Sequence, residues 1–222
     1  MIQNIPISER PREKALQHGV ESLSNRELLA ILIRHGTSGN SALDIADSLL
    51  KDGLLALLNS SLSDLTNIKG IKQVKALELL AWFELSQRIA YEKMIESDSL
   101  SNPDAIVHWC RLKLGSLSQE NFLVIFLNVR NKVLGYKVLF TGTVDSAIVH
   151  PREVFKEAIN ASSSKILLVH NHPSGHLEPS PQDLMITDNL CSAGKMMKIP
   201  VVDHLIVSNT DYFSFKEHGI LD

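Results

Sequence analysis

Residues 167–190 read LLVHNHPSGHLEPSPQDLMITDNL, and three kinds of local structure meet in this stretch. Its apolar start belongs to KILLVHN, residues 165–171, which predicts a buried strand. A Pro-Ser-Gly sequence at 173–175 predicts a turn. PQDLMITDNLCSAGK, residues 181–195, then predicts a helix. A strand, a turn and a helix in this order favour a domain that mixes strands and helices.

Side chains that bind metals gather along the same stretch. His170 and His172 are two positions apart on the expected strand, so they face the same way. Asp183 lies in the first turn of the helix, whose N-terminus faces back toward the end of the strand. Two imidazoles and one carboxylate can then converge. Catalytic zinc commonly takes three protein ligands and leaves a place for water, so a zinc site is one interpretation of the pattern.

A second interpretation of these residues stays open. Ser180, Pro181 and Asp183 have the pattern of a helix start, with a serine N-cap, a proline at the first helical position and a capping-box acid. A His-x-His pair alone also occurs by chance. Spacing alone therefore leaves both a metal site and a helix cap possible. His176 and Glu178 are interpreted as solvated loop residues.

The rest of the second half alternates strand and helix patterns. PREVFKEAINA, residues 151–161, begins with a proline and predicts a helix. The strand patterns are NFLVIFLNV at 121–129, KVLGYKVLFTG at 132–142, SAIVH at 146–150, IPVVDHLIVS at 199–208 and DYFSF at 211–215. The first two are joined at residues 128–132 and form a hairpin. We expect an α/β or α+β domain that begins near residue 103.

The first 95 residues or so predict helices. NRELLAILIRH, residues 25–35, and SALDIADSLL, residues 41–50, have apolar residues on one face, and Asn40 or Ser41 is the expected cap of the second helix. Residues 74–92 contain no Gly or Pro and predict a long helix. The polar stretch from 96 to 104 is the expected linker. We therefore predict domains at 1–100 and 101–222.

Composition bounds the class of protein. The chain has 222 residues, 44% of them hydrophobic and 21% charged, which is typical of globular proteins with a real core. The net charge of -3 gives no overall attraction to nucleic acid, although a local basic patch remains open. Cys110 and Cys191 form no CxxC pair, so a thiolate zinc site is not expected. The N-terminus lacks an apolar signal core and the apolar runs are far below about eighteen residues, so we expect a cytoplasmic protein without a membrane partner.

The metal-ligand spacing resembles that of a known family. His170-x-His172, seven residues, Ser180, two residues and Asp183 match the H-x-H-x7-S-x2-D signature of JAMM (MPN-type) zinc metallopeptidases. HNHPSG with PSPQD is similar to the RadC family (UPF0758-type), as are residues 10–40 and VVDHLIV at 201–207. The resemblance covers nearly the whole chain. It implies an all-helical N-terminal domain, then a mixed-sheet JAMM/MPN-type (cytidine-deaminase-like) domain.

The resemblance also implies roles. His170, His172 and Asp183 would hold Zn2+, and Ser180 would hydrogen-bond the bound water or steady the oxyanion. The family needs a catalytic glutamate on an early strand, and Glu120, just ahead of FLVIFL, is our choice.

Other candidates have weaker patterns. Glu153 and Glu157 are rival bases, but they lie in an amphipathic helix. Asp203 and His204 resemble the family's Asp-His pair, which either orients a ligand from behind or simply ends a strand.

A second motif lies in LTNIKGIKQVKALELLAWFEL, residues 65–85. It resembles a helix-hairpin-helix module, in which a glycine-rich turn lets backbone N–H groups approach a DNA phosphate. Lys69, Lys72 and Lys75 add positive charge. Lys72 stands where the module usually has its second glycine, so a helical hairpin that only packs or binds protein stays the alternative.

The resemblance implies a zinc-dependent JAMM-type metallopeptidase that hydrolyses a peptide or isopeptide bond, with Glu120 as general base. The alternative is a DNA-repair-associated protein that binds nucleic acid through its helical domain, or a metal-dependent nuclease. The patterns choose neither the substrate, a peptide or protein of unknown identity, nor the oligomeric state.

Overall fold

The computed structural model describes residues 6, 9–96, 103–142 and 149–221. The chain forms two compact units, Met1–Ser86 and Gln87–Asp222. Within the described residues, no helix has both the length and the apolar composition needed to cross a membrane. The domain ranges 1–100 and 101–222 stay a prediction.

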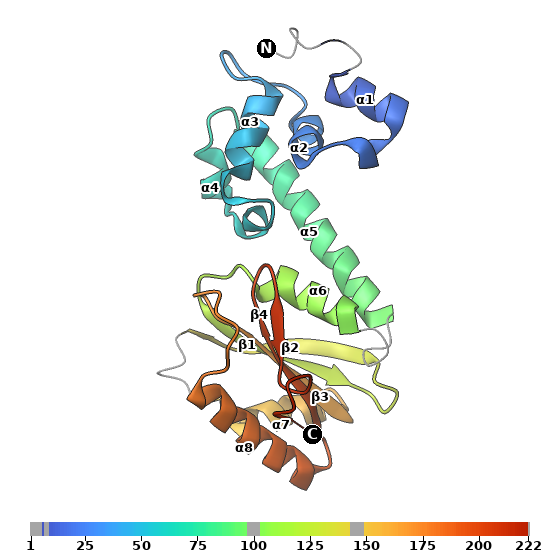
Figure 1. The fold of residues 1–222 in the computed structure, drawn as a ribbon, viewed down its shortest axis with the longest axis vertical. Coiled ribbons are helices and arrows are strands. Elements are labelled where there is room, and N and C mark those ends of the chain that lie inside the picture. The colour runs from blue at the N-terminus through green and yellow to red at the C-terminus, as the bar shows by residue number, and fades with distance from the viewer. Residues whose placement is uncertain (1–5, 7–8, 97–102, 143–148, 222) are drawn as a thin grey trace. The chain divides into compact units, whose positions relative to one another are not determined.

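The first unit is helical, as expected (Figure 1). Its elements are α1 (Pro11–His18), η3 (Val20–Ser22), α2 (Asn25–Ile33), α3 (Ala42–Leu49), η4 (Leu50–Asp52), η5 (Leu55–Asn59), α4 (Leu62–Thr66) and the first turns of α5 (Gln73–Glu96). Serine caps begin three of these helices, and Ser41 caps α3 in a capping box with Asp44. Ile45, Ala46 and Leu65 are almost fully buried at its centre.

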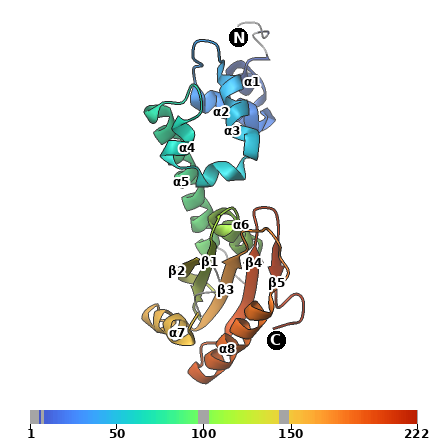
Figure 2. The same ribbon diagram turned by 90° about the vertical axis from the view of Figure 1, so that its left-hand side faces the viewer.

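The second unit is a mixed sheet between helices. Its elements are α6 (Pro103–Leu114), β1 (Glu120–Leu127), β2 (Val133–Gly142), α7 (Pro151–Asn160), β3 (Lys165–Asn171), α8 (Pro181–Met197), β4 (Val201–Val207) and β5 (Tyr212–Ser214). The strands lie in the order β2-β1-β3-β4-β5, which Figure 2 shows from the side. Among the strand pairs in the described part of the chain, β3 and β4 alone are parallel, and α8 forms the crossover that joins them.

The two faces of the sheet have separate cores. Alternate residues of β1, such as Leu123 and Ile125, pack with α6 and the end of α5. Their neighbours, such as Phe122 and Val124, pack with α7 and α8 (Figure 1). This alternation follows from the period of two along a strand. α8 therefore packs on the face of the sheet that carries Phe122 and Val124.

Three segments of the chain, a linker, a strand and a helix, are not as the sequence predicts or lie outside the described residues. Most of the linker expected at 96–104 lies outside the described residues. The strand expected at 146–150 falls on residues 146–148, which also lie outside them, and on Val149 and His150, which form no strand. The helix Pro103–Leu114 was not predicted, although Ile106, Cys110 and Leu114 form its buried face.

Candidate metal centre

A strand, a tight loop and a helix start make the frame of the site. β3 is buried between β1 and β4 and ends at Asn171. The loop then turns at Gly175, whose φ of 77° favours glycine and whose N–H donates to the carbonyl oxygen of His172 at 2.9 Å. α8 begins after Ser180, its N-cap. The start of α8 is therefore brought back beside the end of β3.

Four side chains converge in this frame, from β1, from β3, from the loop that follows β3 and from α8. His170 Nε2 lies 3.1 Å from His172 Nε2 and 3.2 Å from Asp183 Oδ1. His172 Nε2 lies 3.4 Å from Asp183 Oδ2. A carboxylate oxygen of Glu120 joins them, and the four ligand atoms all lie within 4.8 Å of one another. The sequence-predicted ligands and the predicted base thus meet in one cluster.

The register of the sheet places Glu120. Phe122 on β1 pairs with His170 on β3 in the antiparallel ladder. Glu120 is two residues earlier on β1, and His172 is two residues later than His170, so both continue the same face. Asn171 points to the other face, where its side chain accepts from Asn121 N–H at 2.9 Å. Asn171 also donates to two carbonyl oxygens just before β1 and so fixes the strand's first residues.

The cluster is strongly polarised. Burial raises the pKa of Asp183, but hydrogen bonds from His170 and His172 outweigh burial and hold that pKa well below its usual range. The hydrogen bond to Asp183 likewise raises the pKa of His172. A buried carboxylate thus stays ionised between two imidazoles, and it needs a positive partner there.

The donor set fits a zinc ion. His172 Nδ1 lies 2.7 Å from the carbonyl oxygen of His176, which can only accept, so Nδ1 carries a proton. When the ring is neutral, its lone pair is then on Nε2, the nitrogen that faces His170 and Asp183. Two ring nitrogens at 3.1 Å need a proton or a cation beside them. Two imidazoles and a carboxylate with an adjacent glutamate are a common set for catalytic zinc.

Ser180 lies at the edge of the cluster. Its hydroxyl donates to Asp183 Oδ2 at 2.7 Å and accepts from the backbone N–H of Asp183 at 3.1 Å. Its own N–H donates to the same Oδ2 at 2.7 Å. The helix-cap interpretation is therefore confirmed as a local structure. It leaves Asp183 Oδ1 facing His170.

The two glutamates that rival Glu120 as general base lie outside the cluster. Glu157 pairs with Lys137 at 2.8 Å, and Glu153 pairs with its neighbour Arg152 at 3.0 Å. Neither glutamate belongs to the cluster, and the side chains of His176 and Glu178 are outside it as well.

A second layer of polar side chains lies behind His170. His204, on β4, has its Nε2 2.8 Å from His170 Nδ1, and its Nδ1 lies 2.7 Å from the hydroxyl of Thr187. Burial, with His170 close by, holds the pKa of His204 well below its usual value. Sequence reasoning did not find Thr187, although its position one turn after Asp183 on α8 is a usable signal.

Asp203, the neighbour of His204, forms hydrogen bonds with the C-terminal segment and not with the cluster. Its carboxylate accepts from the hydroxyl of Ser214 at 2.6 Å and from the N–H of Lys216 at 2.9 Å. Burial raises the pKa of Asp203, and these hydrogen bonds partly offset that rise. Asp203 therefore ties β4 to the C-terminal segment and does not reach the cluster.

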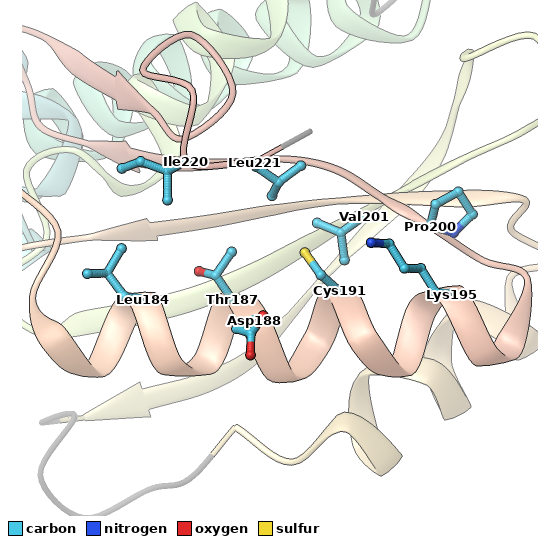
Figure 3. Close-up of a pocket in the computed structure, with 9 residues that line it drawn as sticks. All are labelled: Leu184, Thr187, Asp188, Cys191, Lys195, Pro200, Val201, Ile220 and Leu221. Atoms are coloured by element: carbon cyan, nitrogen blue, oxygen red, sulfur yellow. The ribbon is translucent and has the colours of Figure 1, made fainter.

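A pocket of about 350 Å³ runs along α8 beside the cluster. Figure 3 shows side chains of α8, among them Thr187 and Cys191, directed toward the C-terminal segment at Ile220 and Leu221. The pocket shares Thr187 with the layer behind His170 but includes none of the four cluster residues.

This fold and this cluster define a domain of the JAB type, the JAMM/MPN class, which is a hydrolase-type fold with a potential metal site. The model of the RadC-like JAB domain matches residues 100–220, and the model of the UPF0758 N-terminal region matches residues 2–77. The chain belongs to the UPF0758 family, with a RadC-like JAB domain.

Full-length relatives support this membership. A UPF0758 protein of Clostridium botulinum (strain Alaska E43 / Type E3) is 44% identical over 223 aligned residues, which cover 99% of this chain and 97% of that relative. A UPF0758 protein of Geobacillus sp. (strain WCH70) is 42% identical over 221 residues, with 99% and 98% covered. The names of these two relatives state a family and no activity.

Proposed function

We propose that this protein is a zinc-dependent metallopeptidase of the JAMM type, which hydrolyses a peptide or isopeptide bond. The observation that carries this proposal is the convergence of Glu120, His170, His172 and Asp183, with their ligand atoms within 4.8 Å. His170, His172 and Asp183 already make three protein ligands, so the carboxylate of Glu120 beside them can act as a general base.

The residues divide the chemistry among them. His170, His172 and Asp183 would hold the zinc ion, which when bound supplies Lewis acidity and makes a coordinated water acidic near neutral pH. Glu120 accepts a proton from the attacking water and passes it to the leaving nitrogen. The Ser180 hydroxyl has one proton, now donated to Asp183 Oδ2. It would turn that proton to the oxyanion as the carbonyl is attacked.

Metal content and hydrolysis test the proposal separately. We expect stoichiometric zinc in protein purified without chelator, and its loss in His172→Ala. Glu120→Gln should keep the zinc but lose about 10²- to 10⁴-fold in hydrolysis of a mixture of peptides and lysine isopeptides. Glu153→Gln, whose carboxylate pairs with Arg152, is the matched control and should be unchanged. Substoichiometric zinc in the unaltered chain would contradict the proposal, as would full activity in Glu120→Gln.

A second candidate function, nucleic-acid binding, is supported by a groove of about 740 Å³ in the first unit. Lys69, Lys72 and Lys75 line it, and Gly70, with a φ of 102°, forms the turn. Lys75 donates to the carbonyl oxygens of His35 and Gly70 at 2.6 and 3.2 Å, so it holds the turn together. Lys69 and Lys72 are therefore the lysines that would meet phosphates as point charges.

A salt series tests this candidate. Single-stranded DNA should bind the full chain with an affinity that falls as salt rises, by about 0.7 in log–log slope for each phosphate neutralised. Lys69→Ala with Lys72→Ala should reduce that slope, while Lys51→Ala, on exposed η4, should not. An affinity that ignores salt would exclude phosphate contacts. Cleavage of the DNA that depends on Glu120 would instead favour a metal-dependent nuclease.

A further inference from the structure

The ring of His170 has a polar neighbour on each side. Its Nε2 faces the cluster, while its Nδ1 lies 2.8 Å from Nε2 of His204, which is fully buried on β4. His204 Nδ1 lies 2.7 Å from the hydroxyl of Thr187, and that hydroxyl lies 2.6 Å from the backbone oxygen of Asp183. Two side chains, those of His204 and Thr187, thus connect the backbone of one candidate ligand to the ring of another.

The direction of these hydrogen bonds follows from counting protons. The carbonyl oxygen of Asp183 can only accept, so the short contact at 2.6 Å takes the single proton of the Thr187 hydroxyl. The Thr187 oxygen is then an acceptor toward His204. His204 Nδ1 must therefore carry a proton and donate it to Thr187.

The surroundings of His204 determine whether its other ring nitrogen, Nε2, carries a proton. Phe215 stacks on the ring at 4.6 Å between centroids, and Phe122 meets it edge-on at 5.7 Å. No ion pair reaches His204 among the residues that the structure describes. A cation in this apolar place would be costly, so the ring is neutral and has one proton, on Nδ1. Its Nε2 accepts from His170 Nδ1–H.

The consequence lies at the metal side of His170. With its proton on Nδ1, a neutral His170 has its lone pair on Nε2, which faces Asp183 Oδ1 at 3.2 Å. If Thr187 donated to His204 instead, every proton in the chain would reverse, and His170 would present an N–H to the cluster. The hydrogen bond from Thr187 to the Asp183 carbonyl therefore determines which tautomer His170 adopts. In one tautomer Nε2 can bind a cation, and in the other it cannot.

We propose that His204 and Thr187 are positioning residues, which hold His170 in the tautomer whose Nε2 lone pair faces the cluster. Their value for metal binding rests on the proposed zinc function, while the tautomer itself does not. His172 needs no such support, because the carbonyl of His176 already fixes its proton on Nδ1. Ligating histidines generally use their second nitrogen in this way, and losing the partner commonly weakens metal binding about 10- to 100-fold.

The first experiment reads the tautomer in the chelator-treated full chain. Long-range ¹H–¹⁵N correlation spectra of ¹⁵N-histidine-labelled protein distinguish a protonated ring nitrogen from a bare one, and His204→Gln assigns the His204 signals. We expect His204 to carry its proton on Nδ1, whether His170 is neutral or charged. A proton on His204 Nε2 would overturn the proposal. This readout needs no metal, so it stands or fails apart from the zinc function.

The second experiment tests the Thr187 hydroxyl. Thr187→Val keeps the branched shape but removes the donor, and Thr187→Ser restores it. Zinc affinity, measured by competition with a chelating dye, should fall about 10- to 100-fold in Thr187→Val and return toward that of the unaltered chain in Thr187→Ser. Equal zinc affinities and an unchanged His204 tautomer in Thr187→Val would refute the positioning role. Should Thr187→Val fail to fold, the Thr187→Ser affinity and the tautomer of the unaltered chain decide.

Discussion

Ser180→Ala and Ser41→Ala remove the same hydrogen bonds from two different helix starts. At α3 the hydroxyl of Ser41 donates to Asp44 Oδ2 at 2.7 Å and accepts from Asp44 N–H at 3.2 Å. The corresponding distances at α8, between Ser180 and Asp183, are 2.7 and 3.1 Å. Only Asp183 is buried and in contact with histidines. The pair of variants therefore separates helix capping from support of the candidate ligand.

The expected costs differ because of burial. Loss of a serine cap costs about 1 kcal/mol, and water can replace the lost bond at exposed Asp44. Asp183 is 4% exposed, so its carboxylate loses a charge-assisted bond that water does not replace, which raises the cost to about 2 kcal/mol. Zinc affinity should also fall about 10-fold in Ser180→Ala, at the low end for such support, because the Ser180 N–H still holds Oδ2. Ser41→Ala should leave zinc affinity unchanged.

Urea unfolding with chelator present measures the two free energies. Trp109, 2% exposed, reports the second unit, and Trp82, 55% exposed, can be replaced by phenylalanine in the background so that one emission signal remains. Far-UV circular dichroism follows the helical first unit for Ser41→Ala. Titration with zinc against a chelating dye then gives the change in affinity.

Two outcomes would refute the reasoning. Equal losses of stability in Ser180→Ala and Ser41→Ala, within about 0.5 kcal/mol, would mean that burial of Asp183 adds nothing to the cap. An unchanged zinc affinity in Ser180→Ala would mean that the hydroxyl does not orient the candidate ligand.

Two further predictions concern buried side chains next to the site. Asn171→Ala removes three hydrogen bonds that fix the residues before and at the start of β1, so we expect hydrolysis to fall while zinc affinity stays, and equal losses of both would contradict a role in placing Glu120. Burial raises the pKa of both thiols, but Cys110 is fully buried and Cys191 only half-buried. A thiol reagent should therefore label Cys191 in the folded chain and Cys110 only after unfolding, and early labelling of Cys110 would contradict this packing.

Local features of the fold were predictable from sequence. The long helix expected at 74–92 is α5, Gln73–Glu96, because nothing in its sequence breaks a helix. The cap of α3 is Ser41, one of the two residues expected there, and the cap of α8 is Ser180, as one of its two interpretations predicted. In both, a serine followed three residues later by an acid satisfies two backbone N–H groups. The hairpin of β1 and β2 follows from two apolar runs and the turn between them.

The place of Glu120 in the cluster was expected only from the family resemblance, and other contacts between distant segments were not predictable. The pairing of His204 with His170 depends on β4 lying parallel to β3, which in turn depends on the crossover through α8. No local pattern in IPVVDHLIVS indicates which side chain the histidine meets. The same holds for Asn171: its position between His170 and His172 suggested only that it points away, whereas the structure shows it fixing the start of β1. Such roles depend on the register of the sheet and not on spacing along the chain.

The two interpretations of Ser180 and Asp183 turn out to be compatible because a carboxylate has two oxygens. Oδ2 accepts from both the N–H and the hydroxyl of Ser180, as a helix cap requires. Oδ1 faces His170 Nε2 at 3.2 Å. A cap that fixes one oxygen also fixes the direction of the other, so the helix start orients the candidate ligand at no further cost in side-chain freedom. The spacing of serine and aspartate, three residues apart, therefore serves the helix and the cluster together.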